Sequence, residues 1–177
     1  FEDQSIITRS VQFLNVSEKA IYLTKMLSMS IDFREDEFDV LTLYGAHNNE
    51  RNMDRRPLTS GIVQIESLRG TSSPHQAPFM ALLRKGTDED HGEVFAANFV
   101  YSGNFIATAQ VDPYRNVRFQ MGMNPWNSEW KLEPEQKFQT PEVVMAYSSQ
   151  GLGEMSHTYH KFYQNHLIRS PYATKER

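Results

Sequence analysis

The chain has 177 residues and a formal net charge of −4 at pH 7; 39% of its residues are hydrophobic and 12% are aromatic. This length and apolar content suit one folded domain and exclude a wholly disordered chain. The negative charge argues against a nucleic-acid partner, and no apolar run approaches the ~20 residues of a membrane-spanning helix, so we expect no membrane partner either.

Residues 1–33 alternate apolar and polar side chains, a pattern that predicts a β-hairpin with one face on a core. In the first strand we place Ile7 and Phe13 on the apolar face. Residues 15–20 form a polar turn. The second strand would run over residues 21–33, which is longer than most strands, so we expect a bulge or a bend within it.

An acidic turn at residues 34–37 precedes a predicted strand at residues 38–44. Residues 45–56 contain almost no apolar side chain, so we predict a long polar loop there. Strand character returns in residues 57–68, and a loop rich in Gly, Ser, Thr and Pro follows at residues 69–74.

The middle of the chain carries its most apolar segments. Residues 78–83 predict a short buried strand, and residues 85–92 predict a charged turn bounded by glycines. Residues 94–101 are apolar at nearly every position. A strand that is apolar on both sides is typical of the centre of a sheet that is covered on both faces.

Two further strands, at residues 104–111 and 117–123, flank a proline-containing turn and therefore predict a hairpin. Short strands follow at residues 130–132 and 142–147, separated by a charged turn at residues 133–137. The total of roughly ten strands with turn signals between them predicts an antiparallel sandwich.

One helix is predicted near the end of the chain, because apolar side chains recur there at helical spacing. We expect Pro171 to help stop this helix. The apolar stripe must pack either on the sandwich or on another part of a longer protein. Its residues are Leu152, Met155, Tyr159, Phe162 and Tyr163.

Candidate metal and nucleophile sites are weak. Glu154, His157 and His160 have helical spacing, but a second such motif is missing, so we interpret them as surface residues and expect no metal site. Ser73 and His75 lie in a loop that lacks the glycine-flanked turn of a nucleophilic serine.

Trp126 and Trp130 are candidates for sugar stacking, but large aromatic side chains more often pack in cores and at edges. We therefore expect both to serve packing first.

Three long blocks carry a resemblance to a known family: RGTSSPHQAPFMALLR, GEVFAANFVYSGNF, and the stretch from FQMGMNPWNSEW to SHTYHKFY. In this order they resemble the N-terminal β-domain of bacterial α-galactosidases of glycoside hydrolase family 36. The resemblance implies an all-β, mainly antiparallel β-supersandwich of the galactose-mutarotase-like kind with one C-terminal α-helix. It assigns residues 1–150 to this sandwich, with an N-terminal part preceding Phe1, and residues 151–177 to a helix and linker leading to a catalytic barrel.

The resemblance also implies a function. The parent protein would be a retaining α-galactosidase that releases terminal α-linked galactose from sugars such as melibiose and raffinose, without a cofactor. Its catalytic aspartates would lie on the barrel, so we expect no catalytic residue in this chain, and we interpret the acidic turns at residues 34–37 and 88–90 as solvated. The chain would be a scaffold that docks on the barrel and supports a homo-oligomer.

Two alternatives remain open: a stand-alone carbohydrate-binding module, and a domain that serves oligomerisation alone. The absence of cysteine suits a reducing, cytoplasmic location. The lack of an initial methionine suggests that the chain is part of a longer protein.

The polar loop at residues 45–56 is the candidate substrate site. The family commonly has Gly-Ala-Trp-x-x-Glu-Arg at this place, and the loop approaches the substrate mouth of the barrel. This chain keeps Gly45 and Ala46 but has His47 where the family usually has tryptophan. Sugars are held by hydrogen bonds to planar polar groups, together with an apolar face. The candidate substrate-binding residues are His47, Asn48, Glu50 and Arg51.

Overall fold

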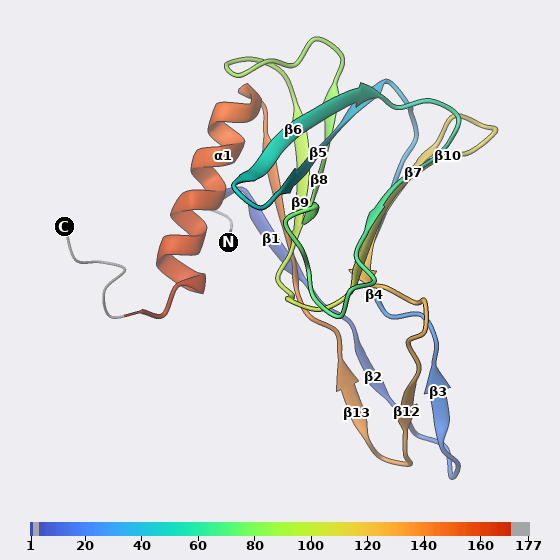
Figure 1. Cartoon of the computed structure of the whole chain (residues 1–177). Helices are drawn as coiled ribbons and strands as arrows, with labels where there is room; N and C mark the ends of the chain where they lie inside the picture. Colours follow the sequence, from blue (N-terminus) through green and yellow to red (C-terminus); the bar gives the residue numbers. More distant parts are fainter. Residues whose placement is uncertain (2–3, 171–177) are drawn as a thin grey trace.

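Two antiparallel sheets pack face to face, and helix α1 (Gly151–Phe162) lies against the outer face of the larger sheet (Figure 1). This arrangement comes from a computed structural model, which describes Phe1 and residues 4–170. The predicted class is confirmed: the chain is mainly antiparallel strands with one α-helix near the end of the described part.

The larger sheet has six strands, and the most apolar segments of the chain form its interior. β9 pairs with a neighbour on each side and is covered on both faces, by the second sheet and by α1, which confirms the predicted central strand. In spatial order the strands are β1 (Ile6–Arg9), β14 (Val143–Ser148), β9 (Val94–Phe99), β8 (Gln76–Arg84), β5 (Phe38–Ala46) and β6 (Asn49–Pro57).

The smaller sheet has four strands, and its centre is the predicted hairpin. The Asp112 carboxylate accepts hydrogen bonds from the backbone N–H groups of Tyr114 (2.8 Å) and Asn116 (2.9 Å), which fixes the turn between the two central strands. In spatial order the strands are β4 (Leu27–Phe33), β11 (Val117–Met123), β10 (Phe105–Val111) and β7 (Gly61–Glu66).

The hairpin predicted for residues 1–33 is wrong, because its strands do not pair with each other. β1 pairs with β14 and β4 pairs with β11, both more than eighty residues further along the chain. The predicted inner face is also wrong at the start: Ile6 is buried, whereas Ile7 is 66% exposed. The expected bend is confirmed, because the second strand is interrupted after Leu23 and resumes at Leu27.

Two small ladders extend from one end of the sandwich (Figure 1). β2 (Gln12–Leu14) pairs with β13 (Lys137–Gln139), and β3 (Ile21–Leu23) pairs with β12 (Trp130–Leu132). Asn15 links them, since its side-chain amide donates hydrogen bonds to two backbone carbonyls. The charged composition around β13 concealed this strand. The described residues contain fourteen strands rather than the ten expected, because β6 and β13 were not predicted and because two predicted strands are divided, into β1 and β2 and into β3 and β4.

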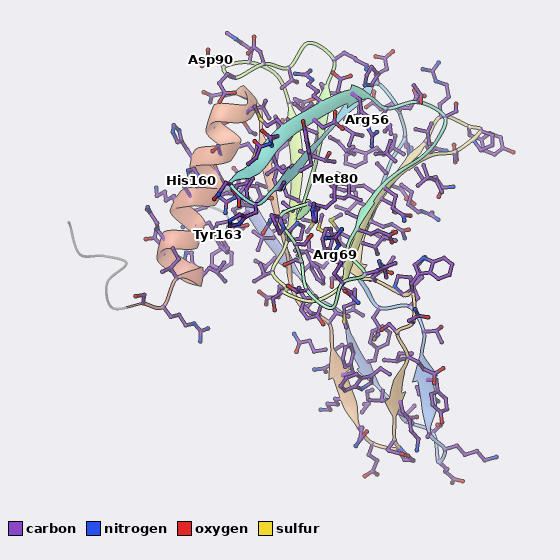
Figure 2. All side chains as sticks on the ribbon, in the orientation of Figure 1. Arg56, Arg69, Met80, Asp90, His160 and Tyr163 are labelled. Carbon is purple, nitrogen blue, oxygen red and sulfur yellow. The ribbon has the colours of Figure 1, made fainter. Side chains whose placement is uncertain are left out.

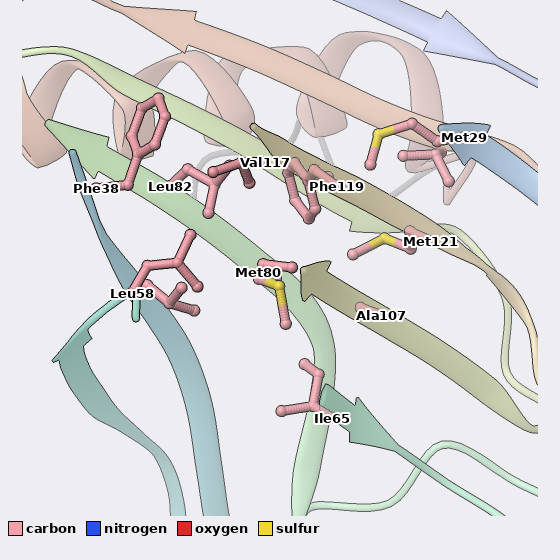
Figure 3. Close-up of a cluster of buried hydrophobic side chains, with 14 of the residues drawn as sticks. Met29, Phe38, Leu58, Ile65, Met80, Leu82, Ala107, Val117, Phe119 and Met121 are labelled. Atoms are coloured by element: carbon pink, nitrogen blue, oxygen red, sulfur yellow. The ribbon is translucent and has the colours of Figure 1, made fainter. Parts of the chain in front are cut away.

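The main core fills the space between the two sheets (Figure 3). Met80 and Leu82 of β8 point into it from the larger sheet, and Phe119 and Met121 of β11 meet them from the smaller sheet. All four side chains are almost completely buried. Burial of this apolar surface is the main stabilising contribution to the sandwich.

A second core lies on the other face of the larger sheet, beneath α1. Met155, Tyr159 and Phe162 are buried there, so the predicted apolar stripe packs on the chain's own sheet. The Tyr159 hydroxyl donates a hydrogen bond to the Val144 carbonyl (3.0 Å). The helix continues as a π-helical turn, η2 (Tyr163–Leu167). It therefore ends before Pro171, which lies outside the described residues.

The acidic turn at residues 88–92 holds the start of α1. Backbone N–H groups of Gly151 and Leu152 donate to the carbonyls of Gly92 and Asp88, which satisfies two donors that a helix start leaves free. Gly151 has φ of +78°, and a Cβ there would lie 2.6 Å from the Glu89 carbonyl oxygen, so only glycine fits. Within the described residues, no helix is long and apolar enough to span a membrane.

Alkaline pH should weaken the packing of α1 on the sheet. Burial raises the pKa of the Tyr159 phenol well above its ordinary value, and burial raises that of Tyr163 as well. A raised pKa in the folded state means that stability is intact below the unfolded value of about 10 and is lost as the pH rises above it. Urea midpoints between pH 8 and pH 11 should therefore fall for the wild type, and fall less for Tyr159→Phe. Equal pH dependence in both proteins would contradict this assignment.

Candidate functional site

The predicted loop at residues 45–56 is a β-hairpin instead. Residues 49–57 form β6, which pairs with β5 along its whole length and lies at the edge of the larger sheet. An edge strand needs backbone partners on one side only and can keep polar side chains on both faces. β6 has only Met53 as a large apolar residue, so its sequence carried no alternating apolar pattern.

The tip of this hairpin has a fixed, unusual backbone. His47 and Asn48 form the turn, and Asn48 and Arg51 both have positive φ, 62° and 61°. Left-handed backbone is well tolerated by asparagine but uncommon for arginine, and such positions cluster at functional sites. The Asn48 backbone N–H donates to the Glu50 carboxylate (3.0 Å), which braces the turn from inside.

Gly45 allows the hairpin to close. A Cβ at this position would lie 2.6 Å from the Glu50 Cα and even nearer to the Asn49 carbonyl oxygen. The β5–β6 register shifts between Tyr44 and Ala46, so a bulge brings the two backbones together here. The glycine is thus required by close approach of backbone.

The structure brings the four candidate residues to one hairpin end, where all four are exposed. Asn48 and Glu50 are joined by their hydrogen bond, and His47 lies at the turn. Arg51 differs from the others, since it also lines a groove beside the hairpin.

The groove has a volume of about 540 Å³ and lies between the hairpin, β8 and α1. Its floor is apolar, and the polar groups that line it come from the hairpin, the turn at residues 88–92, β9, α1 and η2. Figure 2 shows His160 and Tyr163 on the side of the helix that faces the hairpin. The Tyr163 hydroxyl donates to the Asn98 side chain (2.8 Å). Sequence periodicity placed Tyr163 on the buried stripe, but it gave no sign of the groove.

Aspartates in the acidic turns and at an exposed ion pair are held in their charged form. A hydrogen bond from Arg115 lowers the pKa of Asp36, and a hydrogen bond from Arg118 lowers that of Asp32. Backbone N–H groups of the turn lower the pKa of Asp88. A glycosidase acid needs a carboxyl whose pKa is raised, so these acidic side chains are unsuited to that role.

The other candidate sites do not assemble. Glu154 accepts a hydrogen bond from the Ser148 hydroxyl, and the described residues contain no group of three or more metal-binding side chains. In the loop before β8, the His75 ring lies 3.4 Å from the Ser73 hydroxyl, but the same nitrogen contacts the Arg69 guanidinium. That nitrogen is therefore not free to activate the serine.

The two tryptophans differ in how they pack. Trp130 packs on Phe138, with ring centroids 5.0 Å apart, as expected for an edge aromatic. Trp126 is 63% exposed, so the expectation that it serves packing is wrong.

Comparison with known proteins adds family relationships to this geometry. Residues 1–133 match the model described as "Glycosyl hydrolase family 36 N-terminal domain", and residues 137–177 match the model described as "Melibiase". The whole chain is 47% identical to alpha-galactosidase AgaA of Geobacillus stearothermophilus and 40% identical to alpha-galactosidase 1 of Pediococcus pentosaceus. It spans about a quarter of the length of these relatives, 24% in each case.

The fold is shared with solved structures. A crystal structure of the Geobacillus AgaA in complex with stachyose matches with a TM-score of 0.98 at 47% identity, and it covers 100% of this chain and 25% of that one. The galactosidase domain of AgaSK matches with a TM-score of 0.96 at 39% identity, covering 98% of this chain and 24% of that one.

Proposed function

Because the chain belongs to glycosyl hydrolase family 36 as its N-terminal domain, we propose that it is the non-catalytic domain of a retaining α-galactosidase. The parent enzyme would release terminal α-linked galactose from oligosaccharides such as melibiose and raffinose. The observation that carries this proposal is the family match over residues 1–133, supported by relatives of 40% identity and above that are alpha-galactosidases. The lowered pKa values of Asp32, Asp36 and Asp88 agree with a catalytic acid that lies elsewhere in the parent enzyme.

We further propose that the chain consists of two segments with different roles. Residues 1–150 would form the scaffold, and residues 151–177 would lead into the catalytic barrel. The start of α1 at Gly151 supports the boundary, and the Melibiase match, which begins earlier at residue 137, supports a connection from this part of the chain to the barrel. The groove beside α1 would face the rest of the same polypeptide, because its apolar floor is open on the outer side of the sheet.

The hairpin tip would form one wall of the substrate pocket. Its four polar residues are exposed, and its backbone is fixed by Gly45 and by the hydrogen bond between Asn48 and Glu50. A preorganised turn loses little freedom when it contacts a sugar. Imidazole at His47 offers less stacking area than the indole common in the family, but it can donate or accept a hydrogen bond.

The proposal also covers the oligomeric state and the cellular location. The protein would act as a homo-oligomer, for which the ladders that extend from the sandwich, with exposed Val16 and Tyr22, offer a contact surface. It would reside in the cytoplasm, a reducing compartment that suits a chain without cysteine.

Replacing His47 by tryptophan in the full-length enzyme tests the hairpin assignment. His47→Trp should change the ratio of kcat/KM for raffinose to that for melibiose by roughly ten- to two-hundred-fold, because one contact at a pocket wall is worth ~1–3 kcal/mol. His91→Trp is the matched control, since His91 is an exposed histidine in the turn at the start of α1. Both variants should melt within about 2 °C of the wild type, because exposed substitutions cost little.

An unchanged substrate ratio in His47→Trp, with an unchanged melting temperature, would mean that the hairpin tip faces solvent only. An equal change in His91→Trp would show that the effect is not specific to the hairpin.

A further inference from the structure

A second cavity opens on the opposite face of the same hairpin. It has a volume of about 320 Å³ and lies between the inner face of the larger sheet and strand β7 of the smaller sheet. In Figure 1 this is where β6 and β7, the edge strands on the same side of the two sheets, stand apart. We name it the inner cleft. Its lining residues are Thr42, Tyr44, Asp54, Arg56, Gln64, Ile65 and Gln76.

The inner cleft forms because the inner face of β5 changes character along its length. Val40 is fully buried in the main core, Thr42 two residues further on is still buried, and Tyr44 is 46% exposed. The partner strands follow the same change. Asp54 lies opposite Thr42 in the ladder, and Gln76 lies opposite Tyr44. The core therefore gives way to a polar chamber at this end of the sandwich.

One buried polar atom of the inner cleft has no protein partner among the described residues. The Gln76 side-chain oxygen is buried from solvent, and no hydrogen bond reaches it from any described residue. Gln64 differs from Gln76, because it alternates with Val63 and Ile65, which pack on the main core, so its exposed side chain lies on the outer face of the smaller sheet. A buried polar atom without a partner costs free energy, so each such atom in a native structure calls for a missing partner.

The charges of the inner cleft identify the chemical class of that partner. Asp54 and Arg56 lie 3.9 Å apart, so their charges balance, and neither an anion nor a cation is favoured. The Gln76 amide, the hydroxyl groups of Thr42 and Tyr44 and this ion pair offer donors and acceptors together. The half-exposed ring of Tyr44 offers an apolar face. The volume falls at the lower end of the range for small-molecule sites.

From these observations we propose that the inner cleft is a binding site for a neutral sugar, one hexose unit in size. The Tyr44 ring packs against the C–H face of the sugar, and the hydroxyl groups of the sugar form hydrogen bonds with Gln76 and the Asp54–Arg56 pair. This site does not depend on the role proposed for the hairpin tip, because the two lie on opposite faces of the sheet.

Titration of the ¹⁵N-labelled 177-residue chain with methyl α-galactoside tests this site. Saturable shifts of the side-chain amide signals of Gln76 are expected, with a dissociation constant on the order of millimolar. Gln76→Leu should weaken binding about five- to tenfold, the effect of losing one hydrogen bond. Arg56→Leu, on an exposed edge strand, should weaken it similarly and guards against a folding defect in Gln76→Leu. The affinities of both variants are compared with that of the wild type once their circular dichroism spectra have been shown to match its spectrum.

The control variant is His47→Ala, which should leave the affinity unchanged and so separates this site from the hairpin tip. Inorganic phosphate and tetramethylammonium are the charged probes, and neither should shift the Gln76 signals. Absence of saturable shifts with methyl α-galactoside would overturn the proposal. So would binding that survives both Gln76→Leu and Arg56→Leu, binding lost only in His47→Ala, or stronger binding of either charged probe.

Discussion

Phe119→Ala should lower the free energy of unfolding of the chain by about 3–5 kcal/mol, the range for removing a buried aromatic side chain. Phe119 is 1% exposed and belongs to the core between the two sheets, where Met80 faces it from β8 (Figure 3). A close-packed core relaxes only partly around such a cavity. Because domains are stable by ~5–15 kcal/mol, the melting temperature should fall on the order of 10 °C.

Tyr114→Ala provides the matched comparison, since it removes an aromatic ring that is 85% exposed at a turn. Its cost should stay within about 0.5 kcal/mol. Chemical denaturation of the three proteins measures both effects. A loss below 1 kcal/mol in Phe119→Ala would show that the sheets do not pack through this residue.

The purified 177-residue chain should show no turnover of a chromogenic α-galactoside. Retaining hydrolysis needs one carboxyl as nucleophile and a second, with a raised pKa, as acid, held ~5 Å apart. In this chain, hydrogen bonds from Arg118 and Arg115 lower the pKa of Asp32 and Asp36, and backbone donors do the same for Asp88. Each of these carboxylates is tied to a turn or to an exposed ion pair.

The measurement compares release of the chromophore with a sample purified from cells carrying an empty vector. Turnover above that background, abolished by replacing a single aspartate or glutamate of the chain, would place catalysis within these residues after all.

The strands that could be predicted from sequence are those whose environment leaves a local pattern. β8 and β9 are covered on both faces and read as continuous apolar runs, and α1 shows its stripe because one side packs on the sheet. β6 could not be predicted in this way. It is held by backbone hydrogen bonds to β5, and its exposed side chains carry no periodicity.

The sequence predicts where the strands lie better than it predicts which strands pair with each other. The first strands alternate as a hairpin would, yet β1 finds its partner in β14. Nothing local distinguishes these two outcomes, since alternation reports only that one face is buried.

The candidate site is likewise predicted from sequence only in part. Family resemblance and residue chemistry predict the candidate residues His47, Asn48, Glu50 and Arg51, and the structure places them at one hairpin end. The groove and the inner cleft could not be foreseen. Each is lined by residues from elements far apart in sequence, such as Arg51 and His160 in the groove, or Ile65 and Asp54 in the inner cleft.

The nested pairing of the strands has a consequence for synthesis on the ribosome. β4, β3, β2 and β1 pair in turn with β11, β12, β13 and β14, so the first strand made is the last to be paired. At about 5–20 residues per second, Ile6 waits on the order of ten seconds for Ala146 to appear. Until then the early strands offer open edges to other nascent chains, the situation in which a holding chaperone is of most use. A chain ended at residue 133, where the first family match stops, would never close this pairing.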